Sequence, residues 1–161
     1  MLVIPEIAAR RKVDRMSEDS WSWTVDTSLP SQHGAHEPLV NEVLAQLKQL
    51  EWNGRDLFAV EMALVESLIN AMRHGNRLDP TKNVLVECKA SPERFWLRVQ
   101  DEGPGFIPEV VPDCTADENL ECCGGRGLAL IRAYMTSVEY NERGNIVTME
   151  KLRTNGPPDG A

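Results

Sequence analysis

Glu66-Ser-Leu-Ile-Asn-Ala-Met-Arg-His-Gly75 is the run of sequence from which the fold of this chain can be worked out. Glu66 and Asn70 are four residues apart, so on a helix they share one face. That face lies away from the apolar stripe of the same segment, which contains Leu64, Val65, Leu68 and Ile69. Taken alone, the pair is best explained as two solvated side chains, because charged residues on helices are usually exposed.

A second run, Asp101-Glu-Gly-Pro-Gly105, follows a segment rich in β-formers and places a carboxylate at a strand end, next to two glycines. Such an Asp can accept a hydrogen bond from an exocyclic amine such as that of adenine. The glycines let a ligand approach the main chain. A tight turn with an acidic first residue explains the same run equally well.

A third run, Gly124-Gly-Arg-Gly127, opens into a predicted helix. Its backbone amides and the positive end of that helix can hold phosphate oxygens. The chain has neither the P-loop order Gly-x-x-x-x-Gly-Lys-Ser/Thr nor Gly-x-Gly-x-x-Gly after a strand, which argues against Walker and Rossmann nucleotide sites.

Hydrophobic periodicity predicts the elements around these runs. Asn53 is expected to cap the second of three helices, with Asp56 three residues later. The predicted helices are 37–50, 54–75 and 126–135, and the predicted strands are 21–26, 83–88, 95–100, 137–141 and 146–152. This order predicts an α+β fold, a two-layer sandwich with helices on one face of a mostly antiparallel sheet.

Length and charge limit the classes of function. The 161 residues are enough for one domain, which we expect at 21–153, between a flexible arm (1–20) and a flexible tail (154–161). The net charge of −8 opposes direct binding to nucleic acid or to an anionic membrane. No apolar run approaches the ~18 residues of a spanning helix, and the N-terminus does not resemble a signal peptide. We therefore expect a cytoplasmic protein.

Two further features are interpreted from composition. The four cysteines form no Cys-x-x-Cys pair, so free thiols are expected rather than a zinc site. The segment 106–123 has two prolines, five acidic residues and little periodicity. It is too long for a simple connector in a compact domain, and we interpret it as a flap over a functional site.

In their order along the chain, the three runs resemble the N box and the two glycine boxes of the GHKL ATPases, which have the Bergerat fold. Three short patterns are most similar to the anti-sigma-factor serine/threonine kinases of bacterial partner-switching systems: Asn70-Ala-x-x-His-Gly-Asn76, Gly125-Arg-Gly-Leu-x-Leu-Ile131 and Val138-Glu-Tyr140. The resemblance spans about residues 21–153. It changes the interpretation of Glu66 and Asn70 from surface residues to site residues.

The resemblance implies ATP and Mg²⁺ as cofactors and a role for each motif residue. Glu66 would be the general base, Asn70 the magnesium ligand and Asp101 the residue that reads adenine. Gly103 and Gly105 would shape the base pocket, and the phosphates would lie on Gly125, Arg126 and Gly127. The chemistry agrees, because Mg²⁺ favours oxygen ligands and a nearby Glu can take a proton from an attacking hydroxyl.

Three residues at the end of the N box stay outside this set. His74 fits a capping role at the helix end about as well as a second base. For Arg73 and Asn76 we expect solvated side chains rather than phosphate contacts, since exposed helix ends normally carry such groups.

Two departures from the family pattern concern the pocket. Many relatives have Gly-Thr in the last hairpin, where the Thr supports adenine binding, whereas here Gly144 is followed by Asn145, with Thr148 further along. Some kinases of the family have an arginine before the second glycine box, where this chain has Cys122-Cys123.

The resemblance implies a kinase that phosphorylates a STAS-type anti-sigma-factor antagonist, binds a sigma factor when free, and forms a homodimer. An alternative is a nucleotide-dependent module that sequesters a regulator with little or no phosphotransfer. A third hypothesis, the ATP domain of a histidine kinase, requires a phospho-acceptor histidine on a long upstream helix. His33 and His36 instead lie beside the first predicted strand.

Overall fold

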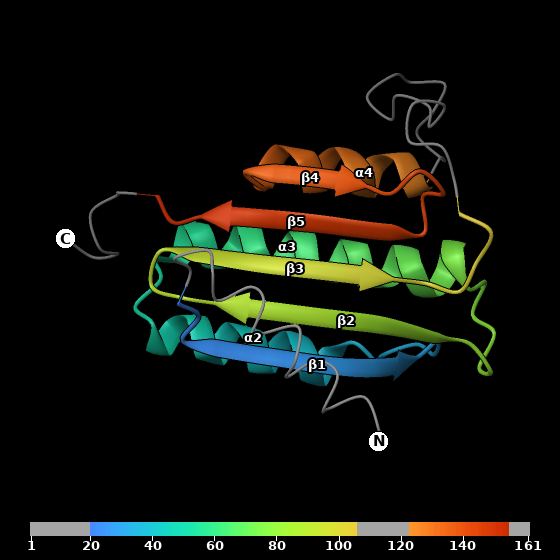
Figure 1. Ribbon diagram of the computed structural model, residues 1–161, viewed down its shortest axis with the longest axis horizontal. Helices are drawn as coiled ribbons and strands as arrows, with labels where there is room; N and C mark the ends of the chain where they lie inside the picture. Colours follow the sequence, from blue (N-terminus) through green and yellow to red (C-terminus); the bar gives the residue numbers. More distant parts are fainter. Residues whose placement is uncertain (1–19, 106–122, 155–161) are drawn as a thin grey trace.

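The computed structural model describes residues 20–105 and 123–154. The strands are β1 (Trp23–Pro30), β2 (Asn83–Ala90), β3 (Arg94–Gln100), β4 (Ser137–Tyr140) and β5 (Ile146–Leu152). The helices are α2 (Glu37–Gln49), α3 (Gly54–Asn70) and α4 (Cys123–Tyr134), and a π-helical turn, η1 (Ala71–Gly75), continues α3. The helices lie together behind the sheet in Figure 1.

The strands form a single sheet in the order β1-β2-β3-β5-β4. All pairings between the described strands are antiparallel, and the register places Val86 opposite Val99 and Val99 opposite Val147. The structure therefore confirms the predicted α+β sandwich with helices on one face of the sheet. None of the helices in the described ranges is long and apolar enough to cross a membrane.

The core lies between the sheet and the helices. Alternate residues of β2 and β3 are buried, including Val84, Val86, Phe95, Leu97 and Val99. They pack against the apolar stripes of the helices, which contain Val43, Leu47, Val60, Leu64, Leu68 and Ile131. Each such side chain contributes about 1.5–3 kcal/mol when it leaves water, so this contact holds α3 firmly against the centre of the sheet.

The start of α3 has the predicted cap. The Asn53 side chain accepts a hydrogen bond from the Asp56 backbone N–H at 2.8 Å, and its amide donates to the Asp56 carboxylate at 3.0 Å. Asp56 itself is fully buried. It also accepts from the Thr154 backbone N–H at 2.8 Å and lies 3.7 Å from the Lys151 ammonium. Thr154 begins the segment predicted as a tail, and here it is bonded to the first turn of α3.

Some element bounds differ from the prediction. β1 begins at Trp23 and includes Pro30, whereas the strand was expected at 21–26. α4 begins at Cys123, three residues before the expected start, so Gly124 and Gly125 lie in the first turn of the helix and Gly127 directly follows it. The predicted arm and flap fall almost wholly outside the described residues.

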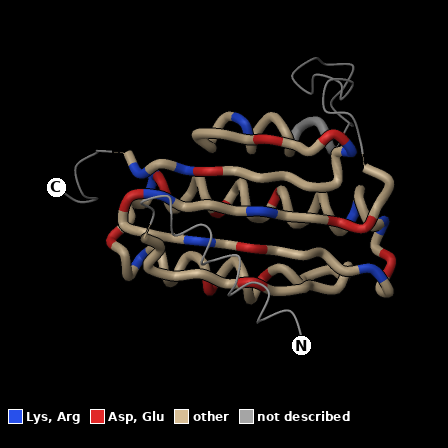
Figure 2. Tube along the Cα trace, viewed as in Figure 1, with Lys and Arg blue, Asp and Glu red and all other residues tan. Residues whose placement is uncertain are grey.

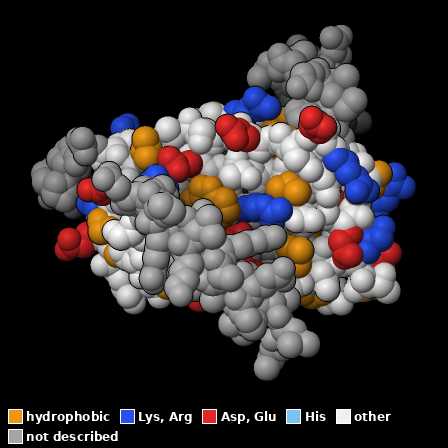
Figure 3. All heavy atoms as spheres, in the orientation of Figure 1, with side chains coloured by type: hydrophobic (Ala, Val, Ile, Leu, Met, Phe, Trp, Pro, Cys, Tyr) orange, Lys and Arg blue, Asp and Glu red, His pale blue; other side chains and the backbone are white. Residues whose placement is uncertain are grey.

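The face of the sheet opposite the helices is the one seen in Figure 3, with apolar and charged side chains side by side. Lys89 lies 4.8 Å from the centre of the Trp96 ring, and Arg94 lies 4.4 Å from that of Trp21. Acidic and basic residues are interspersed along the strands and loops (Figure 2).

Candidate functional site

Glu66 and Asn70 meet α4 just after its first turn. A Cβ atom added at Gly127 would lie 2.7 Å from Glu66 Oε2 and 3.1 Å from Asn70 Nδ2. A side chain at this position would have to displace the ends of Glu66 and Asn70, so glycine leaves both of them in place against α4. The structure thus brings together the first and third runs of the sequence, which are more than fifty residues apart.

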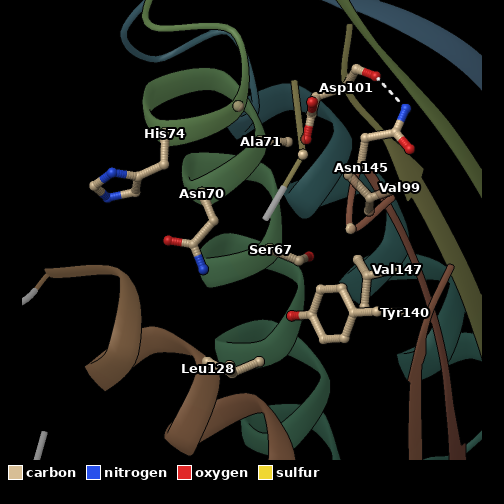
Figure 4. A pocket seen from close by; sticks show the side chains of 13 residues that line it. Ser67, Asn70, Ala71, His74, Val99, Asp101, Leu128, Tyr140, Asn145 and Val147 are labelled. Carbon is tan, nitrogen blue, oxygen red and sulfur yellow. Dashed lines mark hydrogen bonds between the residues drawn. The ribbon is translucent and has the colours of Figure 1, made fainter. Parts of the chain in front are cut away.

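A cavity of about 250 Å³ lies beside this contact, between α3 and the sheet. Figure 4 shows Asn70 and His74 on one side of it and Asp101 at its upper end. Its walls are largely apolar and include Ala71, Val99, Leu128 and Val147. Apolar walls with a few polar groups are typical of a pocket for an organic ligand such as a nucleobase.

Asp101 stands at the end of β3 with only 9% of its surface exposed. Its Oδ1 accepts a hydrogen bond from the Gly103 N–H at 2.8 Å. Burial raises the pKa of this carboxyl group, against the Gly103 hydrogen bond and the positive charges of Arg143 and Lys82, which lower it. Asp101 is therefore a desolvated acceptor at the cavity, as expected of a residue that receives a hydrogen bond from an amine.

Three glycines shape the backbone around Asp101. A Cβ atom at Gly75 would overlap the Asp101 carboxylate, and one at Gly103 would overlap the Gly75 carbonyl oxygen. Gly105 has a φ of +82° and lies against the Arg143 carbonyl oxygen, which a Cβ would also overlap. Gly105 lines the cavity directly. Gly75, which the sequence analysis took only as a helix end, thus belongs to the site.

The hairpin between β4 and β5 closes the other side of Asp101 through Asn145. The Asp101 N–H donates to the Asn145 carbonyl oxygen at 3.0 Å, and the Asn145 amide donates to the Asp101 carbonyl oxygen at 3.2 Å (Figure 4). Asn141 donates to Asn145 Oδ1 at 2.7 Å. Asn145, which stands where many relatives have Thr, therefore holds the main chain of Asp101 by hydrogen bonds. Thr148 alternates with buried Val147 and Met149, so it faces away from the cavity.

The N-box end gives one correction. Asn76 was expected to be solvated, yet only 1% of it is exposed. Three separate segments surround it, and its side chain forms hydrogen bonds with a group of each. Arg73 is exposed, as predicted, and His74 is exposed at the edge of the cavity. Gly125 and Arg126 have helical backbone in α4. The side chains of Cys123 and Arg126, the whole of Cys122 and most of the predicted flap lie outside the described residues.

Ser67 and Tyr140 also line the cavity, and the sequence analysis did not select them. Figure 4 shows the Tyr140 ring below Val147, with its hydroxyl directed toward α3. Burial raises the pKa of Tyr140 to about 12, so its phenol is neutral at physiological pH. The Val138-Glu-Tyr140 pattern was the only sequence signal for this residue.

The described residues suit a magnesium ion that is held mainly by nucleotide phosphates. In the described ranges, no three His, Cys, Asp or Glu side chains gather into a metal site of their own. Asn70 Oδ1 and Glu66 Oε2 both face the gap that Gly127 leaves open. Mg²⁺ in phosphate sites commonly takes one or two protein oxygens and completes its shell with phosphate oxygens and water.

We expect the affinity for ATP to fall as the pH is lowered. The midpoint of this fall should lie at a higher pH than the pKa of an exposed aspartate, because the pKa of Asp101 is raised. In its expected role Asp101 would accept from a 6-amino group in its ionised form, whereas burial favours the protonated form in the free protein. The stability of the fold should depend on pH in the opposite direction. Above the raised pKa the buried charge of Asp101 lowers the stability, and this cost is relieved as the pH falls through that pKa. The measurement is the ATP affinity of the wild type and of Asp101→Asn over a pH series. Protonation of the ATP phosphates affects both proteins equally, so the difference between the two pH profiles reports Asp101. Parallel pH profiles would contradict the prediction.

The fold and this site define an ATPase domain of the histidine kinase type, and comparison with known proteins agrees. Residues 29–151 match the family model of the histidine kinase-like ATPase domain. The chain is 29% identical over 119 residues to the anti-sigma F factor of Clostridium perfringens strain SM101, covering 70% of this chain and 84% of that protein. It is 30% identical over 115 residues to the anti-sigma F factor of Oceanobacillus iheyensis, covering 68% and 78%.

The chain therefore belongs to the histidine kinase-like ATPase family, within the GHKL superfamily, and to its anti-sigma-factor branch.

Proposed function

We propose that this protein is an anti-sigma factor and an ATP- and Mg²⁺-dependent protein serine/threonine kinase that phosphorylates a STAS-type antagonist. The similarity to anti-sigma F factors supports the regulatory role. One observation carries the kinase role: Glu66 and Asn70 face Gly127 next to the cavity that extends to Asp101. In this arrangement a base, a metal ligand and an adenine acceptor share one site.

In the proposed complex, Asp101 accepts a hydrogen bond from the 6-amino group, and Ala71, Val99 and Val147 pack on the base. Free backbone amides in the first turn of α4, including that of Gly125, hold the phosphates, and Gly127 lets Glu66 and Asn70 approach the helix just after that turn. Asn70 Oδ1 would contribute one ligand to Mg²⁺. Bound Mg²⁺ would neutralise charge on the phosphates and align the γ-phosphate for transfer.

Glu66 then acts on the acceptor protein. As a serine or threonine hydroxyl of the antagonist forms a bond to the γ-phosphorus, Glu66 takes the hydroxyl proton. The bond between the γ-phosphorus and the bridging oxygen breaks, and ADP leaves with the electron pair. The position of Glu66 against Gly127 supports this role, because the phosphates bind at the turn of α4 directly before Gly127.

Phosphotransfer is tested with γ-labelled ATP, Mg²⁺ and a STAS-domain protein from the same cell. The proposal expects label on a serine or threonine of that protein, and none when Mg²⁺ is chelated. Binding of ATP without any labelled partner would instead favour the alternative, a nucleotide-dependent module that sequesters a regulator.

The partners and assembly are proposals of the same kind. We expect a sigma factor to co-purify from the native cytoplasm with the chain, and the STAS protein to displace it. A homodimer is expected from light scattering after size exclusion. Failure of a sigma factor to bind in the presence of ATP would contradict the anti-sigma role.

A further inference from the structure

Asn76, the first residue after the η1 turn, is nearly fully buried at a junction of three segments. Its amide nitrogen donates to Ser31 Oγ at 2.9 Å and to the Asn83 carbonyl oxygen at 3.0 Å. Its Oδ1 accepts from the Glu102 backbone N–H at 2.7 Å. The side chain thus joins the region after β1, the start of β2 and the turn that follows β3.

The bond to Glu102 is important for the site because Glu102 directly follows Asp101. On its other side, Asp101 is held through the main chain and side chain of Asn145. Gly75, which precedes Asn76, touches the Asp101 carboxylate so closely that a Cβ would overlap it. Asn76 therefore fixes the peptide after Asp101 and continues the segment that contacts its carboxylate.

We propose that Asn76 is a positioning residue that holds the Asp101 carboxylate where it accepts a hydrogen bond from the 6-amino group of adenine. Through Asp101 it sets the preference for adenine nucleotides; this inference rests on the proposed role of Asp101 as the adenine acceptor. Asn76 is bonded to the peptide after Asp101 and is not among the residues that line the cavity.

The physical reason lies in the turn itself. Residues 102–105 contain Gly103 and Gly105, which restrict the backbone little, so the turn depends on outside contacts for its position. Asn76 Oδ1 provides one of these contacts, and it acts on the peptide next to Asp101. Without it, Asp101 is less well placed, and a hydrogen bond weakens steeply once its geometry is poor.

Ser31 offers a matched control. It is also 1% exposed, and it bonds to Asn76 Nδ2 and to the Lys82 carbonyl oxygen. Ser31→Ala removes buried hydrogen bonds from the same cluster and leaves the Glu102 N–H bonded to Asn76. A loss of stability alone is expected from Ser31→Ala, whereas a loss of adenine preference is expected from Asn76→Ala.

The test measures binding of ATP and of purine riboside triphosphate, which lacks the 6-amino group, to the full-length chain and its variants. The preference for ATP is the ratio of the two Kd values. Asn76→Ala is expected to lower this preference about fivefold, as for a weakened hydrogen bond to a charged group. Ser31→Ala should keep the wild-type ratio. In an Asp101→Ala background, in which the side chain has no acceptor left to position, Asn76→Ala should change the ratio no further.

Binding is measured at a temperature at which unfolding curves show each variant folded. If Asn76→Ala does not fold, Asn76→Ser replaces it, because its hydroxyl fills part of the same space but is one atom shorter than the amide that reaches the Glu102 N–H, and it should lower the ATP preference in the same way. Equal weakening of both nucleotides by the Asn76 variant would overturn the positioning role. A wild type that binds both nucleotides equally would instead overturn the role of Asp101 itself.

Discussion

A Glu66→Gln variant is expected to bind ATP nearly as the wild type does and to transfer phosphate about 100- to 10,000-fold more slowly, the range for loss of a general base. Gln keeps the size of the side chain that packs against Gly127, but its amide cannot take a proton from the acceptor hydroxyl. The measurement is the single-turnover rate of label transfer to the STAS partner, with ATP affinity determined separately.

Glu61→Gln is the matched control, because Glu61 is exposed on the same helix and, unlike Glu66, is not among the nearest neighbours of Gly127. It should transfer phosphate at the wild-type rate. Transfer at the wild-type rate by Glu66→Gln would remove Glu66 from the mechanism, even if the ATP site were correct.

The second large effect concerns stability. Asp56→Ala is expected to lower the free energy of unfolding by about 3–5 kcal/mol, because it leaves a largely buried Lys151 ammonium without its partner. It also removes the acceptor for Thr154 and the side-chain part of the Asn53 cap. Against a total of about 5–15 kcal/mol, this is a large fraction of the stability. Urea unfolding measures it.

Glu61→Ala again serves as a control, since a substitution at an exposed site usually changes stability by less than about 0.5 kcal/mol. Asp56 is at the opposite end of α3 from the cavity, so the folded Asp56→Ala fraction should keep its ATP affinity. A stability loss below about 1 kcal/mol would show that the buried pair contributes little.

The local elements could be predicted from the sequence because their signals are local. The apolar stripe of α3, the Asn53 cap and the alternation in β2 and β3 depend on residues close in the chain, and the structure confirms them. The bounds of β1 were missed because its middle, from Thr24 to Ser28, has few large apolar residues. The arrangement of the sheet followed from the order of elements.

The roles of Asn76, Asp56 and Thr154 could not be predicted in this way. Each depends on partners far along the chain: Asn76 on Ser31 and Asp56 on Thr154. From the local sequence, a polar residue at a helix end is expected to be solvated. Whether a distant segment of the chain covers it is visible only in the structure. For Asn76 this made the prediction of a solvated side chain wrong.

The site residues were identifiable only as a set. Glu66 and Asn70 alone indicated a solvated helix face, and the order of the three motifs changed that interpretation. The structure places Glu66 and Asn70 against Gly127, and Asp101 at the same cavity as Asn70. Apolar members such as Val99 and Leu128 carried no separate signal, because a pocket wall and a core residue have the same sequence pattern.

The central claim is that the cavity between α3 and the sheet binds ATP, with Asp101 as the acceptor of the adenine amine. Calorimetric titration of Mg²⁺-ATP into the wild type and Asp101→Asn at neutral pH tests it most directly. We expect saturable binding to the wild type and an affinity lower by about 3- to 10-fold in the variant, because an amide oxygen accepts the same hydrogen bond without a negative charge and such bonds are about half as strong. Equal affinity of the two proteins, or no binding to the folded wild type, would contradict it.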